Sequence, residues 1–99
     1  MAEPATSFPI LVLPAELRHQ EAPVWIERVS RIGRPQGPLR IDCAAVERFD
    51  SSALAVLLAA LRAAQAAGVA LECLNPPPKL RQLAALYGID SLIFEPAVQ

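Results

Sequence analysis

The feature that most constrains this fold is a long, almost uninterrupted run of strong helix formers over residues 53–67. Asp50 and Ser51 precede the run, and Gly68 follows it. Asp and Ser side chains can accept hydrogen bonds from the free N–H groups of a first helical turn, and glycine readily ends a helix. Because the predicted helix is apolar almost all round, it must be packed on more than one side: against its own sheet, with another protein as a further candidate.

Short apolar segments separated by turn residues predict the strands. Pro9 and Pro14 lie in and after the first of these segments, which places that strand at a sheet edge or shortens it. The predicted strands cover residues 8–13, 39–43, 69–74 and, as a final short strand, 91–94.

Two further helices are predicted between these strands. Pro23 can occupy the first turn of one of them, where its missing N–H costs nothing, and Gly33 can end it. Its apolar positions recur at helical spacing: Trp25, Ile26, Val29 and Ile32. Asn75, as a cap, and the three prolines after it begin the other helix, which Gly88 ends. Its apolar stripe contains Leu80, Leu83, Leu86 and Tyr87.

The alternation of strands and helices predicts an α/β fold: a small, mostly parallel four-stranded sheet with three to four helices and right-handed crossovers. Sites in such sheets tend to lie beyond the carboxyl ends of the strands. The segment 46–52 falls at such an end, so we expect the functional residues there.

The 99 residues suffice for one domain with one core. We expect a tail over residues 1–7 and the domain over residues 8–95. The formal net charge of −1 does not favour a nucleic-acid partner. A modest basic region is interpreted as a solvated helix end; it contains Arg28, Arg31, Arg34 and Arg40.

The cysteine pattern and the hydropathy favour a cytoplasmic protein. Cys43 and Cys73 lie in predicted strands, where free cysteine behaves as a small hydrophobe, and their spacing is neither a disulfide framework nor a zinc motif. We expect no signal peptide. The longest apolar run, residues 53–61, ends at Arg62 and is shorter than the roughly 20 residues of a membrane span. Contact with the membrane is therefore expected only through a partner.

Nothing in the sequence indicates catalysis. Ser51, His19 and several aspartates are present, but nothing spaces them as a triad, and there is no nucleophile elbow or Gly-rich phosphate loop. A lone histidine such as His19 is most often a surface residue. We therefore expect no enzymatic activity, no cofactor and no metal.

The segment Phe-Asp-Ser-Ser-Ala-Leu-Ala-Val-Leu at residues 49–57 resembles the signature of STAS domains, in which Asp-Ser-Ser/Thr-Gly-Leu begins the helix after a short strand. Residues 41–42 resemble the family's Asp-ending strand. Residues 75–76 and 86–89 resemble its following strand end and last helix. The resemblance covers residues 11–94 and implies the STAS fold.

Two branches of this family are similar to the chain. The MlaB branch, a subunit of phospholipid-transport ABC complexes, is closer through Pro-Ala-Glu-Leu at residues 14–17, Trp25 and residues 83–87. The anti-sigma factor antagonists are more distant. In those antagonists the serine after the motif aspartate is phosphorylated, which would be Ser51. In MlaB-type proteins a threonine at that position matters for docking on the ATPase.

The resemblance implies that Ser51 is a partner contact or phosphoacceptor, with Ser52 as the neighbouring hydroxyl. Asp50, Ala53 and Leu54 complete the implied motif and partner surface, with Leu54 exposed on the following helix. Ala53 replaces the motif glycine. Spacing alone favours Ser51 as a simple N-cap, and the resemblance makes the functional interpretation equally good; Asp50 is equally well interpreted as the acceptor of an Asx turn.

Two functions follow from the resemblance. The first is a non-catalytic accessory subunit that binds the cytoplasmic ATPase of a phospholipid-transporting ABC complex. The second is an antagonist that binds a serine-kinase anti-sigma factor until Ser51 is phosphorylated. Asp50 and Glu47 are expected to make this rim acidic, so that an added phosphate repels an acidic partner.

Overall fold

The computed structural model describes residues 10–32 and 37–94. Its main sheet has three parallel strands in the order β1-β3-β5: β1 (Ile10–Val12), β3 (Leu39–Asp42) and β5 (Leu71–Leu74). A second, two-stranded parallel sheet joins β2 (Glu16–Leu17) to β4 (Arg48–Phe49). The helices are α1 (Ala22–Ser30), α2 (Ser52–Ala67), α3 (Pro78–Leu86) and α4 (Asp90–Ile93).

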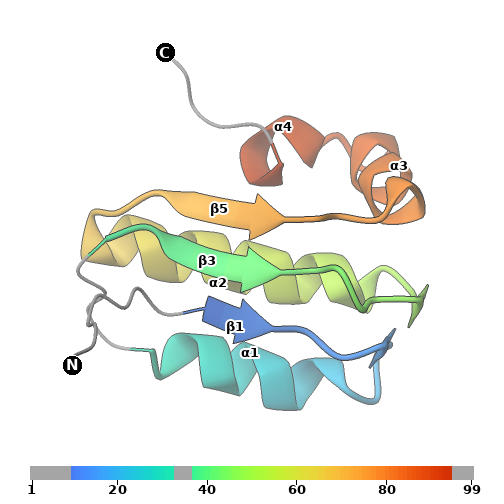
Figure 1. Cartoon of the computed structure of the whole chain (residues 1–99), viewed down its shortest axis with the longest axis horizontal. Helices are drawn as coiled ribbons and strands as arrows, with labels where there is room; N and C mark the ends of the chain where they lie inside the picture. Colours follow the sequence, from blue (N-terminus) through green and yellow to red (C-terminus); the bar gives the residue numbers. More distant parts are fainter. Residues whose placement is uncertain (1–9, 33–36, 95–99) are drawn as a thin grey trace, which may run out of the picture.

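The helices are distributed unevenly around the main sheet (Figure 1). The helix α2 lies along β3 and β5 and contacts both strands, and α1 packs against α2. The short helices α3 and α4 lie beyond β5. The predicted α/β class with a mostly parallel sheet and three to four helices is therefore confirmed.

Alternation along the strands sends apolar side chains towards the helices. Leu39 and Ile41 are buried, whereas Arg40 and Asp42 between and after them are only partly buried. Ile41 pairs with Leu11 on one side and Cys73 on the other, so three apolar residues share one face of the sheet. This face and α2 form the core of the described chain, which also receives Leu13, Leu17, Val29, Leu80 and Ile93.

The two ends of α2 agree with the sequence. The helix covers the predicted run from Ser52, and Gly68 ends it with φ of +75°. Gly88 likewise has φ of +74° after α3. The other predicted stop, Gly33, lies outside the described residues, as does the start of the first predicted strand, Phe8.

Two predictions at the carboxyl half are wrong. Residues 91–94 do not form a strand: helix α4 covers Asp90–Ile93 and buries Ile93 in the core, so the main sheet has three strands rather than four among the described residues. Asn75 does not cap α3, because the N-cap position belongs to Pro77. Asn75 instead takes a left-handed conformation, with φ of +55°, and its Nδ2 donates to Asp42 Oδ1 at 3.4 Å.

Both cysteines are free and lie where small hydrophobes are needed. Cys43 is fully buried just after β3, and Cys73 is half-buried in β5. The Cys73 thiol donates a hydrogen bond to Cys43, and this bond together with burial raises the pKa of Cys73.

No helix in the described part of the chain is long and apolar enough to cross a membrane.

Candidate functional site

The segment that follows β3 holds the predicted motif, and the small β2–β4 sheet positions it. Glu47 and Arg48 both donate their backbone N–H groups to the carbonyl of Ala15, at 2.8 and 2.9 Å. The register pairs Glu16 with Arg48. The turn before α1 therefore lies beside the motif, at the carboxyl end of the main sheet (Figure 1).

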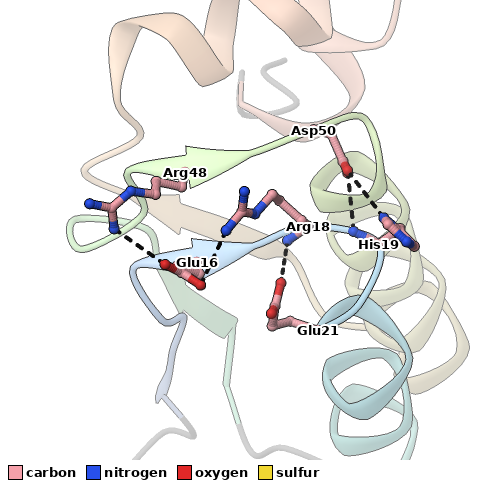
Figure 2. A network of polar contacts seen from close by, with 6 residues as sticks. All are labelled: Glu16, Arg18, His19, Glu21, Arg48 and Asp50. Atoms are coloured by element: carbon pink, nitrogen blue, oxygen red, sulfur yellow. Dashed lines mark hydrogen bonds and ion pairs between the residues drawn. The ribbon is translucent and has the colours of Figure 1, made fainter.

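The Asp50 carboxylate links the start of α2 to the turn before α1. Its Oδ1 accepts a hydrogen bond from the Ser52 backbone N–H at 2.8 Å, which closes an Asx turn at the start of α2. Its Oδ2 accepts the His19 backbone N–H at 3.2 Å and lies 3.8 Å from His19 Nδ1 (Figure 2). The Ser52 amide, and more weakly the His19 amide, hold the pKa of Asp50 below its ordinary value.

Ser51 has a different role from the one that its position suggests. It occupies the N-cap position of α2, but its side chain makes no capping hydrogen bond, so the interpretation of Ser51 as a side-chain N-cap is wrong. Its backbone carbonyl accepts the Leu54 N–H at 3.0 Å. Ser52 differs, because its amide and its hydroxyl both bond to Asp50. Of the two motif hydroxyls, the exposed one of Ser51 is thus the one that makes no capping bond.

The expected exposure of Leu54 is wrong. Leu54 is 3% exposed and Ala53 is 0% exposed, because both project from α2 into the core. Neither can reach a partner while the fold is intact. Ala53 lies inside the helix and donates its N–H to the Asp50 carbonyl at 3.0 Å, so this chain needs no glycine-only conformation at the position.

A wide groove of about 710 Å³ runs beside Ser51. One wall is the motif segment from Glu47 to Ser51 together with Arg18. The opposite wall is the outer face of α3, where Leu86 is 80% exposed and Tyr87 at its end is 58% exposed. The rest of that wall comes from Lys79, Gln82 and Leu83.

The rim of the groove is mixed in charge, not acidic as expected from Asp50 and Glu47. Glu16 accepts from two arginines: Arg18 Nη2 lies 3.3 Å from its Oε1, and Arg48 Nη1 lies 3.3 Å from its Oε2 (Figure 2). These arginines and Lys79 bring cations to the same groove. A phosphate on Ser51 would therefore meet positive as well as negative neighbours.

The sequence reasoning missed the groove as a unit. Arg18 and Lys79 carry no local signal that places them near Ser51, because the β2–β4 pairing and the position of α3 bring them there. The apolar stripe of α3 was recognisable, but it predicts a buried face. Only part of it is buried, since Leu80 is in the core and Leu86 is not.

The groove combines apolar side chains with charged and hydroxyl groups that can bind a partner. His19 faces Asp50 (Figure 2). Among the described residues, no cluster of His, Cys, Asp and Glu could hold a metal ion. Apolar side chains beside a ring of polar groups are typical of a protein interface.

Two comparisons with known proteins bear on this site. A family model described as "Mlab, STAS domain" matches residues 7–94, which is most of the chain and includes the whole groove. A search of curated proteins finds no match.

Proposed function

The chain belongs to the STAS domain family of the Mlab type, and we propose that it is a non-catalytic accessory subunit of a phospholipid-transporting ABC complex. It binds the cytoplasmic ATPase and supports the assembly or activity of the complex. It is cytoplasmic and reaches the inner membrane only through that partner.

The observation that carries this proposal is the combination of an exposed Ser51 with an apolar wall in one groove. Leu86 and Tyr87 offer uncovered apolar surface, and burial of such surface drives association. The Ser51 hydroxyl can hydrogen-bond to a partner without losing an internal bond. Support for the choice of an ATPase comes from the family type rather than from the groove itself.

The same groove also supports a second candidate, an anti-sigma factor antagonist switched by phosphorylation. Ser51 is exposed at the amino end of a 16-residue helix, where a negative charge is tolerated. Phosphorylation would therefore change the docking surface and leave the fold intact. The partner in this case is a serine-kinase anti-sigma factor.

Affinity purification from native cells distinguishes the two candidates. We would compare the tagged wild-type chain with Ser51→Asp in mild detergent and identify the co-purified proteins by mass spectrometry. Ser91→Asp is a matched control, because Ser91 is also exposed at the start of a helix but does not line the groove.

An ABC ATPase with its permease, recovered by wild type and by Ser91→Asp but lost with Ser51→Asp, is the expected result. Recovery of a soluble serine kinase, with phosphate on Ser51, would replace the transporter proposal with the second candidate. Recovery of neither class of protein would contradict both.

A further inference from the structure

The face of α3 that lines the groove at Ser51 changes in character along its length. The residues of this face are Lys79, Gln82, Leu83 and Leu86, whose spacing puts them on one side of the helix. Lys79 and Gln82 are exposed near the start of α3, and Leu86 is exposed at its end. The wall therefore has a charged end and an apolar end, roughly 10 Å apart along the helix axis.

The two walls of the groove differ in charge. The motif wall, with Arg18, carries both signs, since it also contains Arg48, Glu47 and Asp50. On the α3 wall, Lys79 is the only charged residue among the described residues that line it. A partner side chain that lies against α3 thus meets one cation and otherwise neutral groups.

The cations of the groove also differ in what they contact. Arg18 and Arg48 each pair with Glu16, at 3.3 Å. The Lys79 ammonium group makes no hydrogen bond or ion pair within the described part of the chain. A carboxylate from a partner can therefore pair with Lys79 without displacing an internal contact.

The fold itself gives no reason for a lysine at this position. Lys79 is exposed and lies in the first turn of α3, which contains no acidic residue. The positive end of a helix dipole disfavours a cation in the first turn and favours an anion. Lys79 thus places an uncompensated positive charge where a neighbouring carboxylate would be stabilising.

We infer that the ATPase of the proposed function binds along α3 through a segment that is both acidic and apolar. A carboxylate of this segment pairs with Lys79, and apolar side chains roughly 10 Å further along cover Leu86 and Tyr87. The inference rests on the proposed function and adds the chemistry of the partner surface. Lys79 selects the partner by charge, and Leu86 and Tyr87 supply the apolar area that is buried.

Charge reversal at Lys79 tests the inference. The purified ATPase is titrated with the wild-type chain and with Lys79→Glu. The variant should bind at least about tenfold more weakly, because two carboxylates then face each other, and added salt should narrow the difference. Arg62→Glu is the matched control: it changes the net charge equally, but Arg62 is exposed on α2 and does not line the groove. Its affinity should equal that of the wild type.

The stability of the isolated variant separates binding from folding. Lys79→Glu puts an anion in the first turn of α3, so its denaturation midpoint in urea should be equal to or higher than that of the wild type. A lower midpoint would mean that Lys79 supports the fold, which overturns its assignment as a residue held free for a partner.

Rescue identifies the carboxylate on the partner. Each exposed Asp or Glu of the ATPase is changed in turn to Lys and titrated against Lys79→Glu. One such ATPase variant should bind Lys79→Glu at least about tenfold better than the unchanged ATPase does. If no variant restores binding, the pairing of Lys79 with a carboxylate is wrong.

The other outcomes distinguish this inference from the proposed function. An ATPase that binds wild type, Lys79→Glu and Arg62→Glu equally well overturns the inference and leaves the proposed function standing. Equal weakening by both variants also overturns it, because net charge rather than Lys79 then governs binding. Failure of any ATPase to bind the wild-type chain overturns both. A wild-type chain that self-associates, with Lys79→Glu monomeric, assigns the groove to a second copy instead.

Discussion

At the scale of single residues, Asp50 supports the fold, whereas Ser51 is the residue proposed to contact a partner. Asp50 accepts backbone hydrogen bonds from Ser52 and His19 and so joins the motif to the turn before α1. Ser51, at the N-cap position itself, contributes no side-chain hydrogen bond to the helix. The residue expected to act on a partner is therefore the one on which the fold depends less.

Ser51→Ala tests this division. Because no capping bond is lost, we expect the free energy of unfolding to change by no more than about 0.5 kcal/mol. Partner affinity should fall, since the hydroxyl lies in the groove. Urea denaturation and a binding titration with the ATPase proposed as partner measure the two effects. A loss of about 1 kcal/mol or more would show that Ser51 caps α2 after all.

The pH dependence of stability tests Asp50. Its folded-state pKa lies below the ordinary value of 3.8, because the Ser52 and His19 amides favour the charged form. The stabilisation is therefore fully present above the unfolded-state pKa and is lost as the pH falls through the folded-state pKa. Denaturant midpoints measured at pH values below about 4 should fall less steeply for Asp50→Asn than for wild type. Parallel curves would contradict this account.

At the scale of elements, the ends of the helices depend on left-handed residues. Gly68 ends α2 with φ of +75°, and a Cβ added there would meet no atom within 4 Å. The space is open, so only the backbone conformation restricts the residue. Asn75 follows β5 rather than a helix, and it also takes a left-handed conformation, with φ of +55°. Asparagine tolerates this conformation better than most residues other than glycine.

Substitutions of Gly68 should therefore follow backbone preference alone. We expect Gly68→Ala to destabilise the fold by about 1–2 kcal/mol and Gly68→Asn to cost less. Thermal or urea unfolding of the two variants, compared at the same pH, gives the order. If alanine is tolerated as well as asparagine, the end of α2 has shifted and the left-handed conformation is not required.

At the scale of the whole molecule, the core is concentrated between the main sheet and α2, while apolar residues of α3 remain at the surface. Leu57 is 0% exposed, and Leu86 is 80% exposed. Because both residues are leucines, only their positions in the fold account for this difference in exposure.

Leu57→Ala and Leu86→Ala make the corresponding matched pair. Removal of the buried side chain should cost about 2–5 kcal/mol, whereas the exposed site should change by no more than about 0.5 kcal/mol. Urea denaturation measures both. Among variants that stay folded, Leu86→Ala should weaken partner binding more than Leu57→Ala, because Leu86 lines the groove. A large stability loss at Leu86 would mean that it is covered in the isolated chain.

Much of the fold could be predicted because its signals are local. The start of α2 is set by a carboxylate that bonds to an amide two residues away, and its end by a glycine next to the last turn. The parallel order of the strands follows from the alternation of the elements, since each crossover helix returns the chain to the same end of the sheet. Residues within a few positions of one another decide such features.

Other features required the tertiary structure. Residues 91–94 contain enough apolar character for a strand, but a helical turn lets Ile93 reach the core beside α2. Leu54 belongs to a helix that is apolar all round, so the sequence could not tell which face meets the sheet. Arg18 and Lys79 meet Ser51 in one groove only because strand pairing and helix packing join distant segments. The sequence by itself determined the two ends of α2, the alternation of the main strands with the helices and the motif at the start of α2. Packing alone decided which side chains of that motif remain at the surface, because exposure is a property of contacts between elements and not of neighbours along the chain.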